Sequence, residues 1–295
     1  MPSRVLLSFA LVLQSSLLTI AGDDDPKETI FKAKSAYTAE IAKLRSEVIA
    51  AFDKREEKAR AAGNKKLVDE IKFYRSAFDE DEEWPAEMPA ELRTRLTKAR
   101  SQVEAAYLIA IKDYTKTKKD EEAAATEKDL AEFRKVAYCP LLDLSKVEVK
   151  EGFFRIPPNT LVTTRKPYKG ALEIALVART EAENIRLHAH RGATVIFNWE
   201  INPAELRVCR PDGKEELLES GSLATAKVTP LKPNTYYTLR WLLTPQGMAV
   251  SENGHIAFSE KKDYDLEGET KIAIGACKSK VDIKEFKVTR LFISK

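Results

Sequence analysis

The sequence predicts an α+β protein of two parts, an N-terminal antiparallel α-helical coiled-coil hairpin followed by an antiparallel β jelly-roll sandwich. Two changes of pattern lead to this prediction. Apolar residues recur at steps of four and three through residues 23–136, which is typical of helices with one buried stripe. Apolar and polar residues then alternate in short runs through residues 137–295, which is typical of half-buried strands. A chain of 295 residues is long enough for about two domains.

The first 22 residues have the pattern of a secretory signal peptide. Arg4 gives a positive start, residues 5–20 carry no charge, and small residues precede the acidic run that begins at Asp23. The apolar run has 16 residues, fewer than the roughly 20 that a membrane-spanning helix needs. We therefore expect cleavage after the signal, a secreted or periplasmic protein, and no membrane span in the mature chain.

The helical part is expected to hold three helices. A stop-and-turn pair, Gly63-Asn64, separates the first helix from a second that continues to Phe78, and a third begins near Pro89. We expect this third helix to run on past Lys119 to Phe133. A narrow apolar stripe on the first helix requires a partner, either within a hairpin or in a second chain, so the helices are a spacer or an oligomerisation element. The stripe comprises Ile30, Tyr37, Ile41, Leu44, Val48 and Ala51.

The second part contains about a dozen short strand-like runs with no helical segment between them. Asn253-Gly254 between two of these runs is a strong signal for a two-residue hairpin. Because parallel strands would need crossover helices, an antiparallel sandwich or jelly roll is expected. The runs are residues 147–156, 161–164, 171–179, 185–190, 193–200, 206–210, 223–228, 236–243, 248–252, 255–259, 271–277 and 281–293.

Several phrases in this part resemble the concanavalin A-like lectin and glucanase jelly rolls, a group that includes laminin-G-like modules and 3-keto-disaccharide hydrolase-like domains. These phrases are residues 172–179, 184–187, 236–241 with 248–255, and 281–288. The resemblance covers just over half of the chain. It implies the jelly-roll fold and says little about function, because one fold can carry many unrelated activities.

The catalytic phrase of the glucanases is missing from this chain. Their E-x-D-x-x-E strand carries two carboxylates about 5 Å apart, which act as nucleophile and acid/base. The candidate here begins at Glu173, but Ala175 and Ala178 occupy the other two positions. Residues 141–144 also lack the opening phrase of the 3-keto-disaccharide hydrolases. We therefore predict no catalytic residue, and hydrolysis of glycosides or 3-keto-disaccharides is kept as the second alternative.

Metal, cofactor and nucleic-acid chemistry have little support in the sequence. His188 and His190 form at most half of a metal site, and His255 is the remaining histidine, so we predict no metal site and no cofactor. The net charge of +3, from 49 basic and 46 acidic residues, does not indicate a nucleic-acid partner. The chain has three cysteines, Cys139, Cys209 and Cys277. We expect them to be buried free thiols, and a disulfide between Cys209 and Cys277 is the alternative.

The alternation within the strands separates a core face from a polar face. Trp199 and Trp241 fall on the apolar side and are expected in the core. The polar side carries a mixed set of donors and acceptors suited to sugar hydroxyls, although an outer sheet face in water would show the same alternation. We interpret the chain as an exported, non-catalytic protein that binds carbohydrate or a cell-envelope glycan; the first alternative is a structural protein–protein adaptor. The candidate ligand-binding residues are Glu173, Arg186, His188, His190, Asn198, Glu200 and Arg207.

Overall fold

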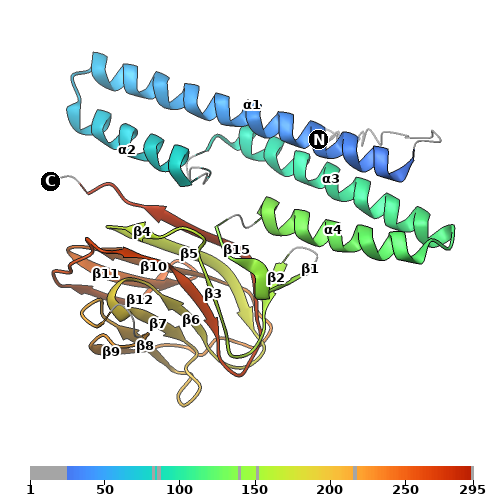
Figure 1. The fold of residues 1–295 in the computed structure, drawn as a ribbon. Helices are drawn as coiled ribbons and strands as arrows, with labels where there is room; N and C mark the ends of the chain where they lie inside the picture. Colours follow the sequence, from blue (N-terminus) through green and yellow to red (C-terminus); the bar gives the residue numbers. More distant parts are fainter. Residues whose placement is uncertain are drawn as a thin grey trace, which may run out of the picture.

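A computed structural model describes residues 25–81, 84, 88–138, 141–150, 153–214 and 218–293. Four helices lie beside a sandwich of two antiparallel sheets (Figure 1), which confirms the predicted α+β class. The predicted signal peptide at 1–22 and Cys139 lie outside the described residues. Among the residues that the structure describes, no helix combines the length and the apolar character needed to cross a membrane.

The helices are α1 (Pro26–Ala61), α2 (Lys65–Asp81), α3 (Ala90–Lys116) and α4 (Asp120–Tyr138). The side chain of Asp25 caps α1 by accepting from the Lys27 amide, and α1 ends before the predicted turn, where Gly63 has a φ of 65°. The expectation that the third helix continues to Phe133 is wrong. The chain turns at Lys118, with a φ of 58°, because this left-handed residue cannot continue a helix.

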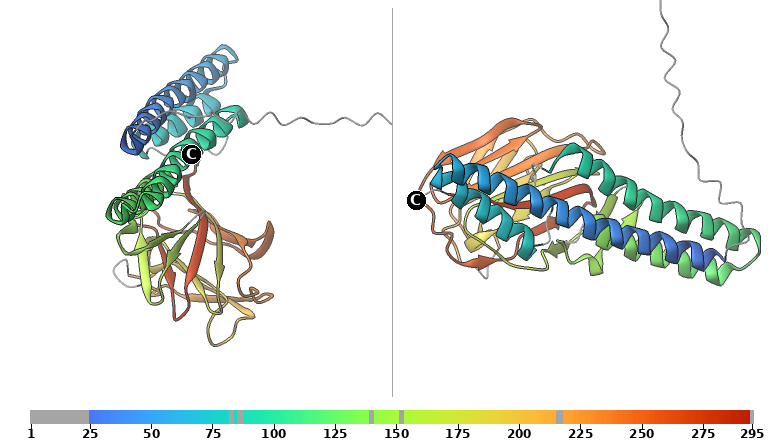
Figure 2. Two further views of the ribbon diagram at one scale, coloured as in Figure 1. Left: turned by 90° about the vertical axis from the view of Figure 1, so that its right-hand side faces the viewer. Right: turned by 90° about the horizontal axis from the view of Figure 1, so that it is seen from above.

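The long helix α1 buries its stripe against three helices, with a different pair of partners along each half. Its second half, with Leu44, Val48 and Phe52, forms a cluster with α2 and the start of α3. Its first half, with Ile30 and Tyr37, packs on the rest of α3 and on α4. The predicted stripe is therefore satisfied within this chain, although by four helices instead of a simple hairpin. The two further views of Figure 2 show these helices running side by side as one elongated layer.

All strand pairs among the described residues are antiparallel, and they form two principal sheets. The run predicted at 147–156 is two paired strands, β1 and β2, instead of one. The seven-stranded sheet has the order β1 (Glu148–Lys150), β2 (Phe153–Ile156), β15 (Val281–Arg290), β5 (Leu172–Thr180), β10 (Tyr237–Thr244), β11 (Gly247–Glu252) and β12 (His255–Lys261). The six-stranded sheet has the order β3 (Thr160–Thr163), β14 (Ala273–Ala276), β6 (Ile185–His188), β7 (Thr194–Phe197), β8 (Glu205–Cys209) and β9 (Leu223–Lys227). Two short strands, β4 (Tyr168–Lys169) and β13 (Glu269–Thr270), pair separately.

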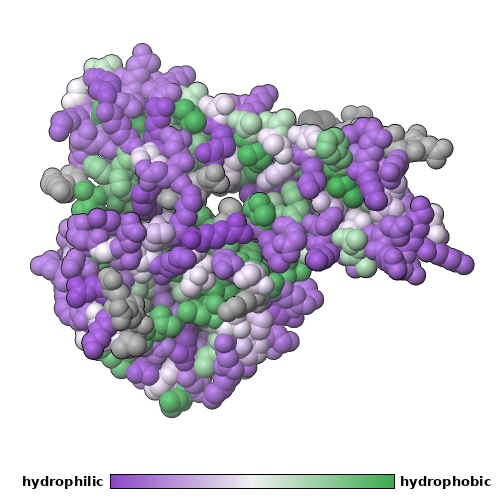
Figure 3. Space-filling model, in the orientation of Figure 1, coloured by the Kyte–Doolittle hydropathy of each residue, from purple (hydrophilic) through white to green (hydrophobic). Residues whose placement is uncertain are grey.

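The core of the sandwich is made by the residues that alternate inward from both sheets. Trp241 of β10 and Val195 of β7 are fully buried, and Leu176 of β5 is 1% exposed. Burying one large apolar side chain in this way stabilises the fold by about 2 kcal/mol. Figure 3 shows the surface of the same view. Hydrophilic residues cover most of the visible helical face, and apolar residues gather over the middle of the sandwich.

The helical layer is attached to the sandwich near the end of β15. The Arg290 guanidinium lies 3.0 Å from the Glu80 carboxylate at the end of α2, and the ammonium of Lys166 donates to the Glu80 carbonyl at 2.6 Å. The rings of Phe73 and Phe292 meet at 5.8 Å between centroids. These contacts hold one end of the layer, while the chain itself connects α4 to β1.

Candidate functional site

The outer face of the six-stranded sheet brings several predicted polar residues together. Arg186, Ile196 and Arg207 are direct neighbours across β6, β7 and β8, in one row. The next row, with Leu187, points into the core and is buried. The pairing therefore directs both arginines away from the core, as the alternation predicted, although Ile196 between them is also buried, at 1% exposed.

The guanidinium of Arg186 is held in one orientation by three neighbours. It donates to the Glu200 carboxylate at 3.0 Å and to the Asn184 side-chain oxygen at 3.1 Å, and it pairs with the Glu219 carboxylate. The Asn184 amide in turn donates to Glu200. Charge-assisted contacts of this kind are stronger than neutral ones and fix the geometry of the group. Arg186 retains 20% exposure of its side chain, so the fixed group still meets solvent.

Trp199 lies beside this cluster, and the prediction that it belongs to the core is wrong. Asn198 has a φ of 56°, and this left-handed residue interrupts the alternation directly before Trp199. The indole is half-buried, and the Arg207 guanidinium lies over its ring at 4.1 Å. The second predicted core tryptophan, Trp241, is fully buried as expected.

Asn198 itself connects loops within the chain. Its amide nitrogen donates to the Ala182 carbonyl at 2.7 Å, and its oxygen accepts from the Leu231 amide at 3.1 Å. The residue is 4% exposed. Its contribution to the site is therefore positional, because it sets the direction of the chain that carries Trp199 and Glu200.

The two candidate histidines are buried. His188 contacts the Thr194 hydroxyl through Nδ1 at 2.8 Å, and burial, with the nearby charge of Arg186, lowers the pKa of its ring to about 4. Burial also lowers the pKa of His190 to about 4, although Gly170 and Asp265 act in the opposite direction. Both rings are therefore neutral near pH 7. Within the described ranges, no three His, Cys, Asp or Glu residues come together in a way that could hold a metal ion.

Glu173 is not brought together with the other candidates. It lies on β5, in the seven-stranded sheet, where it pairs with Arg240 at 3.3 Å. The sequence reasoning also missed Asn184 and Glu219, which complete the surroundings of Arg186. The preference of asparagine for left-handed backbone was a usable signal for the turn at Asn198, whereas no local pattern indicated Glu219.

The carboxylates of Glu200 and Glu219 do not form the pair that glycoside hydrolysis requires. In that chemistry two carboxyl groups face each other across the scissile bond. Here the Arg186 guanidinium lies between them and contacts both. The arrangement can orient hydrogen bonds, but the space needed for a substrate oxygen is filled by the arginine.

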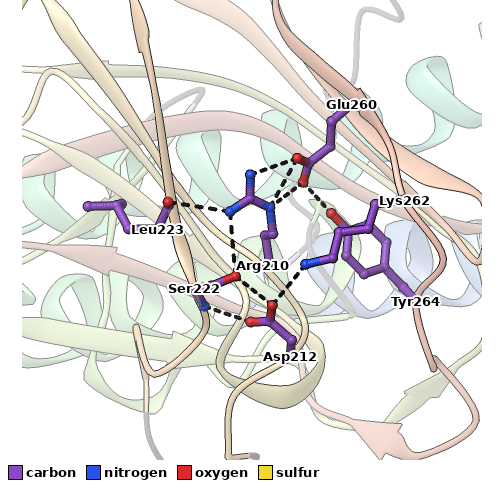
Figure 4. A network of polar contacts seen from close by, with 7 residues as sticks. All are labelled: Arg210, Asp212, Ser222, Leu223, Glu260, Lys262 and Tyr264. Atoms are coloured by element: carbon purple, nitrogen blue, oxygen red, sulfur yellow. Dashed lines mark hydrogen bonds and ion pairs between the residues drawn. The ribbon is translucent and has the colours of Figure 1, made fainter.

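A polar network holds the loop that carries Glu219 (Figure 4). Arg210, at the end of β8, binds the Glu260 carboxylate of β12 at 2.8 Å, and the Asp212 carboxylate accepts from the Ser222 amide at 2.6 Å. Burial alone would raise the pKa of Asp212, but the hydrogen bonds from Ser222 and the charge of Lys262 lower it to about 2. The loop is thereby tied to the edge of the opposite sheet.

Both remaining cysteines of the sandwich are free thiols in the structure, so the open Cys209–Cys277 bridge is not formed. Burial raises the pKa of the Cys209 thiol. A buried thiol with a raised pKa is a poor nucleophile, because the thiolate is the reactive form.

No family model and no curated protein matches this sequence. Among solved structures, the mannose- and calcium-bound lumenal domain of VIP36 is 11% identical with a TM-score of 0.42, and the match covers 52% of this chain and 85% of that one. The carbohydrate-binding module CBM66 from Bacillus subtilis is 6% identical with a TM-score of 0.38, and the match covers 49% of this chain and 91% of that one. The carbohydrate recognition domain of Emp46p is 16% identical with a TM-score of 0.38, and the match covers 51% of this chain and 91% of that one. The fold assignment rests on the strand order and register described above.

Proposed function

We propose that this protein is a non-catalytic carbohydrate-binding protein and that its ligand lies on the outer face of the six-stranded sheet. The observation that carries the proposal is the position of the Trp199 indole, which lies under the Arg207 guanidinium and directly precedes Glu200, the residue that holds Arg186. The proposal agrees with the sugar-binding domains named above, but it rests on the side chains of this face.

The chemistry of this face suits a sugar. A pyranose ring offers an apolar C–H face and a rim of hydroxyl groups, so it is bound by an aromatic surface with donors and acceptors at its edge. Trp199 supplies the surface, Arg186 and Arg207 supply donors, and Glu200 supplies acceptors. Because Arg186 is already held by its neighbours, little side-chain entropy is lost when a ligand binds.

The predicted signal peptide at residues 1–22 bears on the compartment in which the protein works. We propose that the chain is exported and that its ligand is a glycan of the cell envelope or of the extracellular space. The helices would then hold the sandwich away from a surface or bring several copies together. Sedimentation of the mature chain tests the second role, and a strictly monomeric protein over a range of concentrations would remove it.

A glycan array probed with the full mature chain tests the binding proposal. We expect the wild-type protein to bind at least one glycan, and Trp199→Ala and Arg186→Ala to weaken that binding about tenfold or more. Arg240→Ala is the matched control, since this exposed arginine pairs with Glu173 on the other sheet. Trp199→Phe, which keeps an aromatic surface, should retain part of the affinity.

Three results would overturn the proposal. The first is no binding to any glycan by a folded wild-type protein. The second is binding that survives both Trp199→Ala and Arg186→Ala, with thermal melting showing that each variant is folded. The third is release of reducing sugar by the wild type that disappears in Glu200→Gln, because this would make the protein a hydrolase.

A further inference from the structure

We propose a second binding site, for an anionic polysaccharide, on the outer face of the seven-stranded sheet. The site is a strip of alternating cations and aromatic rings, formed by Arg155, Phe153, Arg179, Tyr236 and Lys284, and is called the cationic strip below. Its ligand groups are sulfate esters or carboxylates on a sugar chain. The strip shares no residue with the face proposed above, so the two proposals stand or fall separately.

The register of the sheet places the first two cations. Asp282 of β15 lies opposite Arg155 of β2 on one side and opposite Arg179 of β5 on the other. Its carboxylate accepts from Arg155 at 2.7 Å and from Arg179 at 2.9 Å, and its side chain is only 6% exposed. Two guanidiniums thus share one buried carboxylate, which fixes both of them and leaves one positive charge in excess.

The aromatic rings connect these cations to a third. The Phe153 ring has Arg155 at 5.5 Å and Arg179 at 5.6 Å from its centroid. The Tyr236 ring has Arg179 at 4.9 Å and the Lys284 ammonium at 4.0 Å. Such contacts orient a cation while its outward side stays available to an anion. The side chains of Arg155 and Arg179 keep 22% and 27% exposure, so the strip is open to solvent.

A β-bulge supplies Lys284. The pairing of β15 with β5 shifts between Ile283 and Glu285, so Lys284 has no partner residue in β5. Ile283 before the bulge and Phe286 after it are buried, whereas Lys284 and the following Glu285 are exposed. Bulges of this kind change the direction of a side chain without ending the strand. No described residue forms an ion pair with Lys284, and its charge is therefore available to a ligand.

The charges favour an anionic polymer over a purely structural role. The strip has three cations, Arg155, Arg179 and Lys284, against two carboxylates, Asp282 and the exposed Glu285. Glu148, which lies opposite Arg155, is paired with Lys150, so one net positive charge remains on the strip. The pair of Lys280 with Glu181 at 3.1 Å, at the end of β5, is neutral and does not cancel this excess. Spaced cations with apolar rings between them match a chain whose charged groups alternate with apolar ring faces.

Single-stranded nucleic acid fits the cationic strip less well. Its recognition depends on bases that stack on free aromatic rings. Two cations lie near each of the Phe153 and Tyr236 rings, whereas Trp199 beside the other sheet has one, so charge and not base stacking is the means of recognition that this strip offers.

The test measures binding of the full mature chain to dextran sulfate, to polygalacturonate and to neutral dextran, at low and at physiological ionic strength. We expect at least one of the anionic polymers to bind, with an affinity that falls as salt rises, and no binding of dextran. Preference for dextran sulfate would identify sulfate esters as the ligand groups, and preference for polygalacturonate would identify carboxylates.

Variants then locate the binding on the cationic strip. Lys284→Ala should weaken binding about fivefold, and Lys284→Arg should keep it. Lys261→Ala is the matched control, because this exposed lysine lies on β12, at the opposite edge of the same sheet. Trp199→Ala should leave binding of the anionic polymer unchanged, which separates this site from the proposed carbohydrate face.

The proposal is overturned if neither anionic polymer binds, or if neutral dextran binds equally well. It is also overturned if Lys284→Ala and Lys261→Ala weaken binding to the same extent, since that would show general attraction to a charged surface. A single-stranded oligonucleotide that binds more tightly than both polymers would replace the polysaccharide by a nucleic acid. Thermal melting of Lys284→Ala verifies that the variant is folded.

Discussion

The two buried histidines predict that the protein loses stability in mild acid. His188 and His190 are 3% and 1% exposed, and burial lowers the pKa of each to about 4 from an ordinary 6.5. In the unfolded chain a histidine takes up its proton as the pH falls through 6.5, whereas in the folded protein it resists until about pH 4. The folded state therefore binds fewer protons in this window, and the free energy of unfolding decreases as the pH falls through it.

The size of the effect follows from the width of the window. Each pH unit between the two pKa values costs about 1.4 kcal/mol per histidine. At about pH 5 the loss is about 2 kcal/mol for each residue, or about 4 kcal/mol for His188 and His190 together. That is a large part of the roughly 5–15 kcal/mol that stabilises a typical domain. The lowered pKa of Asp212, about 2, adds its own loss only at lower pH, below the ordinary 3.8 of an aspartate.

Urea denaturation at about pH 7.5 and about pH 5 measures this loss. We expect His188→Gln and His190→Gln each to remove about half of the difference between the two pH values. His255→Gln is the control, because His255 is exposed on β12 and its replacement should leave the difference unchanged. A free energy of unfolding that is equal at both pH values, or a loss that both substitutions leave intact, would refute the reasoning.

Further predictions concern stability and thiol reactivity. Asp282→Ala leaves the two arginines that share this carboxylate unpaired and should lower the free energy of unfolding by about 3 kcal/mol, as chemical denaturation would show. Gly221→Ala would place a Cβ 1.7 Å from the Arg210 carbonyl oxygen, so we expect a lower melting temperature; an unchanged value would contradict the close approach. Iodoacetamide should modify Cys277 before Cys209, because Cys209 is buried and burial raises the pKa of its thiol; mass spectrometry of the peptides shows the order.

Periodicity predicted the class of each element well and the ends of the elements less well. The change from a helical to an alternating pattern correctly predicted helices followed by antiparallel strands. The third helix was predicted as too long because the alanines after Lys119 have high helix propensity and fit the same stripe. The break depends on the left-handed backbone at Lys118, and lysine gives no signal for that conformation.

The candidate site could be predicted only where residues are neighbours within one sheet. Alternation placed Arg186 and Arg207 on one face correctly, because β6, β7 and β8 are consecutive and adjacent. It assigned Glu173 to the same face because β5 directly precedes β6 among the strands, but the chain crosses to the other sheet between them. Which sheet a strand joins depends on contacts between distant parts of the chain, and no local pattern records them.

This crossing determines how the two proposed sites relate. Arg179 shares β5 with Glu173, so it lies on the seven-stranded sheet, where it belongs to the cationic strip. The packed core between the sheets, about 10 Å thick in sandwiches, prevents a side chain of one outer face from reaching a ligand on the other. Two polar faces that look continuous in the sequence are therefore separate surfaces, one with Arg186 between two carboxylates and one with Arg155, Arg179 and Lys284 in a row. For this reason Trp199→Ala and Lys284→Ala should each abolish or weaken one kind of binding and leave the other intact.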